Sequence, residues 1–314
     1  GYRAVKKAVA IGDIQSFIQY MRSFTPPIAR LASISNTSQS TIAAAERVFE
    51  FLDEPEESAD PSVVDDQALA AVQGEVRFDH VSFGYDPEKI IIKDFSALAK
   101  PGQKVAIVGP TGAGKTTIVK LLMRFYELNG GCILVDGRDI TDYSRAQLRS
   151  LFGMVLQDTW LYNATVMENL RYGSFGATDE DVIRAAKAAH CDEFIRALPG
   201  GYDMMMNEEA TNISQGQKQL FTIARSILAD PRILILDEAT SSVDTRTEIL
   251  IQKAMDGLMH GRTSFVIAHR LSTIKNADLI LVMRDGDVVE QGTHEELLKA
   301  NGFYADLYNS QFDE

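Results

Sequence analysis

The chain has 314 residues, a length that at ~150 residues per domain indicates about two domains. Apolar residues make up 45% and charged residues 24%, which is ordinary globular usage and excludes a wholly disordered, collagen-like or coiled-coil chain. The 31 basic and 44 acidic residues give a net charge of −13, so the sequence is a poor candidate for a protein that binds the phosphate backbone of nucleic acid.

The first 52 residues are mainly helical in pattern, because apolar side chains recur at steps of three and four from Ile14 to Ile28. Pro26 and Pro27 are expected to kink or break this run, and a second helix is expected over Thr41–Leu52. The mostly apolar run between Lys7 and Arg22 is shorter than the ~20 residues that a membrane-spanning helix needs, so no complete span is predicted. Two interpretations stay open: a helical hairpin on a core, or the end of a membrane-linked segment.

Residues 53–73 are acidic, contain two prolines and show no hydrophobic period, which is typical of a solvated linker. From Gly74 onward, aliphatic strand-like runs alternate with helical ones, which predicts a buried, mostly parallel α/β sheet. The stretch Asp179–Leu198 breaks this alternation and is predicted to be a helical insert. The expected strands are Glu75–Phe83, Lys104–Val108, Cys132–Val135, Ile233–Leu236, Ser264–Ile267 and Leu279–Met283.

The strongest motif is a complete GxxxxGK[ST] sequence from Gly109 to Thr116, between a predicted strand and a predicted helix. Glycines let the backbone N–H groups surround a phosphate, and the helix N-terminus adds positive potential. We expect Lys115 to reach the β- and γ-phosphates and the Thr116 hydroxyl to bind Mg²⁺. The residues expected to bind the nucleotide here are Gly109, Thr111, Gly112, Ala113, Gly114, Lys115, Thr116 and Thr117.

A second motif is the aliphatic run Ile233–Leu236, which Asp237 and Glu238 follow directly. Side chains at the carboxyl ends of such strands face the ligand site of α/β sheets. Asp237 can therefore hold the magnesium ion, and Glu238 can polarise a water for attack on the γ-phosphate. By itself the pattern is weak, but together with the phosphate-binding loop it is strong.

A third motif, Asn212-Ile-Ser-Gln-Gly-Gln217, precedes a helical run. Ser214 and Gln217 have the spacing of a capping box, which indicates an ordinary helix start. The same cap leaves backbone N–H groups near Gly216 that could bind a second phosphate. Local physics leaves both interpretations open.

The order of these motifs, followed by a lone histidine at position 269, resembles the nucleotide-binding domain of ABC (ATP-binding cassette) transporters over Gly74 to about Asn309. The third motif is similar to the family's LSGGQ signature. It matches at Ser214, Gly216 and Gln217 and departs from it at Ile213 and Gln215.

The resemblance assigns further residues by motif. Tyr85 is similar to the aromatic residue that stacks on adenine, and Gln157 to the glutamine that contacts magnesium and couples to the membrane domain. Asp244 is the last residue of a stretch that resembles the family's D-loop. His269 resembles the switch histidine that contacts the γ-phosphate. Glu208 matches the exporter X-loop glutamate only in part, because Asn207 and Ala210 replace the usual glycines.

The N-terminal residues 12–27 resemble the last transmembrane helix of exporter-type half-transporters. The implied organisation is the end of that membrane domain with its connecting helix at 1–52, a linker at 53–73, and a nucleotide-binding domain at 74–314. This α/β domain would contain a P-loop NTPase core, an antiparallel β subdomain and a helical subdomain at 158–212. The chain would then be the C-terminal part of a half-transporter.

The resemblance implies ATP hydrolysis for export, by a multidrug- or lipid-exporter-like subunit in the cell membrane with its nucleotide-binding domain on the cytoplasmic side. A second half-transporter, identical or related, would enclose two Mg²⁺-bound ATP molecules between each phosphate loop and the partner's Ser214–Gly216. Glu238, His269 and Lys115 would be catalytic, and Thr116, Gln157 and Asp237 would bind the metal. The transported substrate is not readable, because its contacts belong mostly to other helices.

Three alternatives stay open on the sequence. A non-transporting ABC protein of DNA repair or translation is disfavoured by the net charge and by the exporter-like N-terminus. A regulatory nucleotide binder without hydrolysis is disfavoured because the base, magnesium and switch positions are filled. An importer ATPase is a closer relative, and residues 1–52 distinguish it, because importer ATPases are generally separate chains.

Overall fold

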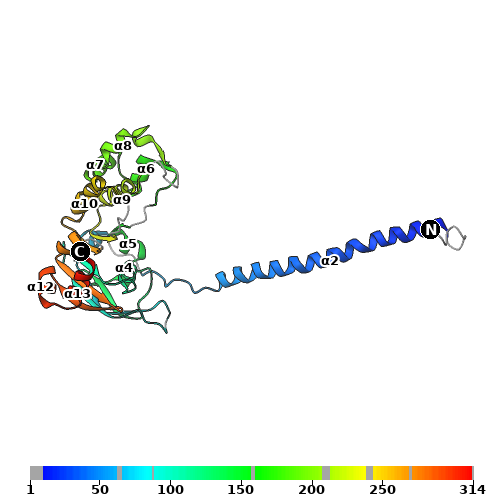
Figure 1. Cartoon of the computed structure of the whole chain (residues 1–314), viewed down its shortest axis with the longest axis horizontal. Helices are drawn as coiled ribbons and strands as arrows, with labels where there is room; N and C mark the ends of the chain where they lie inside the picture. The colour runs from blue at the N-terminus through cyan, green and yellow to red at the C-terminus, as the bar shows by residue number, and fades with distance from the viewer. Residues whose placement is uncertain are drawn as a thin grey trace. The chain divides into compact units, whose positions relative to one another are not determined.

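The computed structural model describes residues 10–61, 66–86, 88–156, 160–206, 213–237, 243–268 and 271–312. The chain divides into two units, Gly1–Ala59 and Asp60–Glu314 (Figure 1).

The first unit is a single long helix, α2 (Ile11–Leu52), which continues through Pro26 and Pro27. The predicted break at the prolines is therefore wrong. Each proline removes one backbone hydrogen bond, but α2 is exposed along most of its length, so water can satisfy the freed carbonyls. Beyond the prolines, the Thr37 and Thr41 hydroxyls donate to carbonyls four residues earlier, at 2.9 Å each, within the continuous helix.

Large apolar side chains on α2 are exposed, including Phe17 at 67% and Phe24 at 68% of their surface. No described helix, α2 included, combines the length and the apolarity that crossing a membrane requires.

The second unit is built on a six-stranded sheet in the order β12-β11-β3-β10-β9-β6. The five strands from β11 to β6 in this order run parallel, and β12 is antiparallel at one edge. This sheet confirms the predicted α/β class. The strands are β3 (Lys104–Val108), β6 (Phe152–Val155), β9 (Ile233–Asp237), β10 (Thr263–Ile267), β11 (Leu279–Arg284) and β12 (Asp287–Gly292).

An antiparallel sheet in the order β2-β1-β4-β5 forms the β subdomain that the family resemblance implies. Its strands are β1 (Val76–Phe83), β2 (Ile92–Ala99), β4 (Gly130–Val135) and β5 (Arg138–Asp139). A third, two-stranded sheet pairs β7 (Ala164–Thr165) with β8 (Met205–Met206).

Helices between β6 and β9 form a separate helical part of the second unit (Figure 1). They are α6 (Val166–Arg171), α7 (Asp179–Ala188), α8 (Asp192–Ala197) and α9 (Gln215–Ala229), and α7 and α8 confirm the predicted helical insert. The other helices are α3 (Asp66–Ala70), α4 (Lys115–Leu122), α5 (Arg145–Ser150), α10 (Thr245–Met259), α11 (Leu271–Lys275), α12 (His294–Ala300) and α13 (Phe303–Phe312), with 3-10 turns at Ile140–Asp142 and Gly201–Asp203.

The main sheet lies between two hydrophobic cores. In β9, Ile233 and Ile235 pack into the core shared with the antiparallel sheet, whereas Leu234 and Leu236 pack into the core shared with the helical part. Alternate side chains of a strand point to opposite faces, so a sheet covered on both faces needs apolar residues at every position. This explains the continuous aliphatic runs in the sequence.

The six predicted strands are confirmed as β1, β3, β4, β9, β10 and β11, with ends that differ by at most two residues. The sequence did not predict β2, β6 or β12. In β2 the buried Ile92 and Phe95 are separated by exposed polar residues, and no residue of β12 is fully buried. Neither strand has the aliphatic run that marks the buried parallel strands.

The acidic stretch 53–73 is exposed from Asp53 to Asp60 but changes character beyond that point. It contains α3, and Val72 is buried in the core. The backbone N–H groups of Gln73, Gly74 and Glu75 all donate to the Asp136 carboxylate. The boundaries 53–73 and 158–212 remain predictions.

Two glycines in left-handed turns provide a stability test. A Cβ on Gly286 (φ 86°) would lie 1.8 Å from the carbonyl oxygen of Ile91, whereas a Cβ on Gly137 (φ 78°) would meet no described atom within 4 Å. We expect Gly137→Ala to cost about 1–2 kcal/mol for its backbone conformation and Gly286→Ala a further ~1–3 kcal/mol because the turn must move. Urea unfolding measures both, and equal losses would contradict the close packing at Gly286.

Candidate functional site

The loop between β3 and α4 has a backbone that depends on glycine. Gly109, Gly112 and Gly114 have φ angles of 151°, 85° and 102°, a region that residues with a Cβ rarely adopt. Gly114 is the N-cap residue of α4, so Lys115 is the first residue of that helix. The loop therefore places the N-terminus of α4 beside the end of β3.

The three glycines serve different purposes. A Cβ on Gly109 would lie 2.3 Å from the carbonyl oxygen of Met283 in β11, and one on Gly114 would lie 2.6 Å from the side chain of Ile92 in β2. A Cβ on Gly112 would meet no described atom within 4 Å. The two outer glycines thus fix the loop between β11 and β2, while the loop is open at Gly112.

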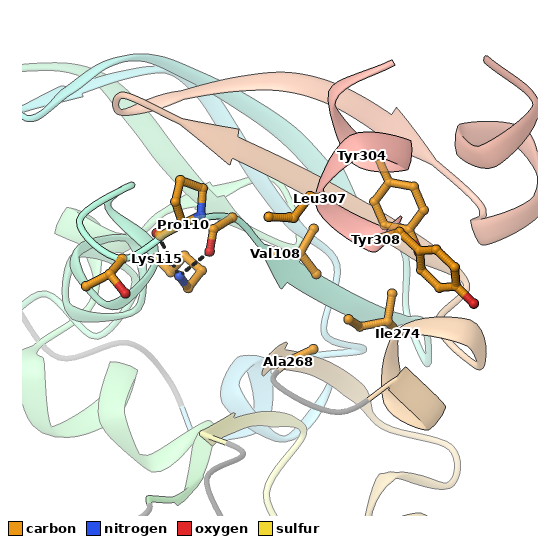
Figure 2. Close-up of a pocket in the computed structure, with 10 residues that line it drawn as sticks. Val108, Pro110, Lys115, Ala268, Ile274, Tyr304, Leu307 and Tyr308 are labelled. Carbon is orange, nitrogen blue, oxygen red and sulfur yellow. Dashed lines mark hydrogen bonds between the residues drawn. The ribbon is translucent and has the colours of Figure 1, made fainter. Parts of the chain in front are cut away.

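Lys115 is folded back over this loop. Its Nζ donates hydrogen bonds to the carbonyl oxygens of Gly109, at 2.7 Å, and Pro110, at 3.0 Å (Figure 2). Burial lowers the pKa of Lys115, and the nearby Asp237 carboxylate opposes that shift. A half-buried ammonium next to a helix N-terminus is a strong attractor for a phosphate group.

The register of the main sheet places Asp237 near Lys115 and the phosphate-binding loop. It is the last residue of β9 and pairs with Ile267 of β10, which pairs in turn with Ile107 of β3. The carboxyl ends of these parallel strands therefore share one edge of the sheet. The Asp237 carboxylate and the exposed Thr116 hydroxyl are hard oxygen donors, and this donor set fits Mg²⁺ together with phosphate oxygens.

Tyr85 lies beside the first turn of α4. Its hydroxyl is 3.3 Å from the Oγ1 atom of Thr117, and its ring packs edge-on against Phe83 and Tyr126 at 5.0 Å each. The Lys120 Nζ lies 5.8 Å from the centre of the ring. About half of the tyrosine surface is exposed, at 47%, so a flat aromatic ligand could stack there.

A cavity of about 120 Å³ is lined in part by the phosphate-binding loop. Figure 2 shows Pro110 and Lys115 at one end of the lining side chains and Tyr304 and Tyr308 of α13 at the other, with Val108 and Leu307 between them. The Tyr304 hydroxyl lies 2.7 Å from His294 Nδ1, which fixes the tyrosine in place. No motif in the sequence predicts that α13 lines this cavity, although the four-residue spacing of Tyr304 and Tyr308 indicates one face of a helix.

Ser214, Gly216 and Gln217 lie at the start of α9. The Ser214 Oγ accepts the Gln217 backbone N–H at 3.3 Å, and the Gln217 Oε1 accepts the Ser214 backbone N–H at 3.0 Å, so the predicted capping box is confirmed. A Cβ on Gly216 would lie 2.6 Å from Thr247 Cγ2, so this glycine allows close contact between α9 and α10.

Asp244 has a local structural role as well. It is the N-cap residue of α10 and accepts the Thr247 backbone N–H at 3.0 Å. Hydrogen bonds from Thr247 lower the pKa of the Asp244 carboxyl. Figure 1 shows α9 within the helical part of the unit, α10 beside it and α4 away from both, so the helices that carry the predicted site residues form two groups within this chain.

Four residues predicted from motifs, Gln157, Glu208, Glu238 and His269, lie outside the described residues. Their neighbours on the chain are described: Asp237 precedes Glu238, and Ala268 precedes His269 and lines the cavity.

Comparison with known proteins identifies the family. Residues 92–241 match the family described as ABC transporter. Over 304 residues the chain is 55% identical to a fatty acid ABC transporter ATP-binding/permease protein of Mycobacterium tuberculosis, covering 97% of this chain and 48% of that protein. The chain belongs to the ABC transporter family. Its second unit thus has the fold of an ABC transporter ATPase domain.

Other relatives are exporters and flippases. Over 312 residues the chain is 44% identical to an ATP-dependent lipid A-core flippase of Desulfotalea psychrophila, covering 99% of this chain and 54% of that protein. A solved structure of a bacterial Atm1-family ABC exporter with ATP bound matches with a TM-score of 0.77 and 39% identity, covering 98% of this chain and 53% of that one. The chain therefore spans about half the length of the relatives it matches.

The position of Lys115 leads to a binding prediction. Replacing it by glutamine removes the charge that we expect to contact the phosphate groups, and a hydrogen bond to a charged group contributes about 1.5–3 kcal/mol. We expect Lys115→Gln to weaken ATP binding about 10–100-fold in a calorimetric titration. Lys299→Gln removes the same charge from an exposed position on α12 and is the control. Equal affinity in the two variants would contradict the assignment.

Proposed function

We propose that this chain binds Mg²⁺-bound ATP at the loop between β3 and α4 and hydrolyses it as the ATPase part of an ABC exporter. The observation that carries the proposal is the convergence of Lys115, Thr116 and Asp237 at one edge of the main sheet, around a loop held open at Gly112. The ATP-bound Atm1-family exporter among the structural relatives supports the same ligand.

The residues have separate roles in this proposal. Backbone N–H groups of the loop Gly109–Gly114, in which Pro110 has none, surround the β-phosphate, and Lys115 neutralises the β- and γ-phosphates. Tyr85 stacks on the adenine, and Thr117 lies beside Tyr85. Thr116, Asp237 and Gln157 hold Mg²⁺, which when bound neutralises charge between the β- and γ-phosphates. Glu238 orients and deprotonates the attacking water, and His269 contacts the γ-phosphate.

The second group of residues completes the site from another chain. Ser214, Gly216, Gln217 and Asp244 sit at the starts of α9 and α10, apart from the phosphate-binding loop of their own chain. Two chains arranged head to tail, or this chain with a related subunit, would place each α9 N-terminus on the ATP of the other. ATP would then favour the closed pair and hydrolysis would reopen it.

The N-terminal helix connects this cycle to a membrane. Residues 1–52 would be the end of a transmembrane domain with its connecting helix, and the ATPase domain would lie on the cytoplasmic side. Relatives named as ATP-binding/permease proteins support the membrane association. The relatives named for fatty acids and for lipid A-core support a lipid-like substrate for the whole protein.

A comparison of two helix N-cap residues distinguishes a structural role of Ser214 from a functional one. Ser214 in α9 and Thr293 in α12 occupy the same position of equivalent capping boxes. We expect Ser214→Ala and Thr293→Ala each to cost about 1 kcal/mol of stability in urea unfolding. Only Ser214→Ala should also reduce the hydrolysis of Mg²⁺-bound ATP, by about tenfold or more, because it alone faces a nucleotide.

Phosphate release at a fixed chain concentration measures this effect. Equal activity in the two variants would remove Ser214 from the site. No hydrolysis by the unmodified chain at any concentration, with no ATP binding, would refute the proposed function itself.

A further inference from the structure

Asp60, the first residue of the second unit, lies in the acidic stretch that follows α2 and contacts two arginines far along the chain. Its Oδ2 accepts the Arg145 backbone N–H at 3.0 Å, and its Oδ1 accepts the Arg145 Nη1 at 2.7 Å. The Arg124 Nη1 lies 3.8 Å from the same Oδ1. A carboxylate held by both a backbone and a guanidinium donor has a defined position.

The arginines around Asp60 are buried. Only 5% of the Arg124 side chain and 9% of the Arg145 side chain are exposed. Glu127 is the second carboxylate of the cluster, with its Oε1 2.9 Å from Arg145 Nη2 and 3.1 Å from Arg124 Nη2. In the described contacts, both carboxylates lie against both buried cations, so loss of the Asp60 charge would weaken the compensation of the cluster.

The cluster lies at the end of the helix that begins with Lys115. Helix α4 ends at Leu122, and Arg124 follows it in a left-handed conformation with φ 51°. The Arg124 Nη1 also donates to the Tyr143 carbonyl at 3.2 Å, just before α5 begins at Arg145. Asp60 therefore contacts the turn that follows α4 and the first residue of α5.

This attachment shortens the connection between α2 and the ATPase domain. Helix α2 ends at Leu52, so only Asp53–Ala59 separate it from Asp60. Seven residues span at most ~25 Å. Without the attachment, the next described element is α3 at Asp66, and the connection would lengthen to thirteen residues, or at most ~45 Å.

We propose that Asp60 is a positioning residue that anchors this connection on the Arg124–Arg145–Glu127 cluster. The anchor ties the N-terminal helix, through a seven-residue tether, to the end of the helix whose first residue holds the ATP phosphates. The anchor thereby limits the range of separations that the connection allows, which a longer linker would widen. The proposal uses the proposed function for the role of Lys115 and of the N-terminal helix, but the anchor itself does not depend on ATP.

Distance measurements between spin labels test the anchor in the full chain. Labels at Glu50→Cys on α2 and Lys299→Cys on α12 occupy exposed positions. Cys132 is half-buried and is replaced by serine in every sample, while Cys191 stays because it is buried and burial raises the pKa of its thiol. The test variant is Asp60→Asn, and Glu56→Gln makes the same charge change at an exposed position of the same segment.

We expect Asp60→Asn to broaden the distance distribution about 1.4-fold, because the extension of a flexible tether grows with the square root of its length. Glu56→Gln should leave the distribution unchanged. Arg145→Lys, which keeps the charge but cannot contact both carboxylates in the same way, should broaden it to a smaller extent.

The proposal would be overturned if the distance distribution of Asp60→Asn superimposed on that of the parent chain. If the melting temperature of Asp60→Asn also fell while the distribution stayed unchanged, Asp60 would be a stability contact only. ATP binding by the same samples is measured separately. Its absence would refute the proposed function and would leave the test of the anchor intact.

Discussion

The structure of the ATPase domain depends on how the loop after β3 is held. Gly109 and Gly114 contact the backbone of β11 and a side chain of β2 so closely that no Cβ fits. The loop therefore packs against two different sheets, the parallel core and the antiparallel sheet. Because Gly114 is the N-cap residue of α4, these contacts also place the N-terminus of that helix.

The register of the parallel strands supplies the rest of the phosphate site. Asp237, Ile267 and Ile107 are aligned across β9, β10 and β3, so the carboxyl ends of the three strands lie at the same edge of the sheet. The second group, at the starts of α9 and α10, is built for helix capping and close helix contact within the chain. Its local roles are complete without a nucleotide, and its proposed role needs a second chain.

Structural features could be predicted from the sequence where a local residue pattern has one physical explanation. The GxxxxGK[ST] loop, the buried aliphatic strands and the capping box at Ser214 each follow from local chemistry, and the structure contains all three. The sequence was silent where a contact joins distant segments. Met283 against Gly109, Thr247 against Gly216, and Tyr304 beside the phosphate-binding loop have no local signal. Pro26 and Pro27 predict a break that α2 does not have, because a long exposed helix tolerates two lost hydrogen bonds.

The same limit applies to the acidic stretch after α2. Its composition indicates a solvated linker, and the side chains of 53–60 are indeed exposed. One carboxylate among them, Asp60, nevertheless contacts two buried arginines that lie 64 and 85 residues further along the chain. Charge composition describes the whole stretch and does not distinguish this residue from its neighbours.

The central claim is that the phosphate-binding loop of one chain and the α9 N-terminus of another form one ATPase site. Phosphate release from Mg²⁺-bound ATP, measured over a wide range of chain concentrations for the unmodified chain and for Glu238→Gln, tests it most directly. The account predicts a rate per chain that rises with concentration and is absent in Glu238→Gln. A rate per chain that is independent of concentration, or that Glu238→Gln retains, would contradict it.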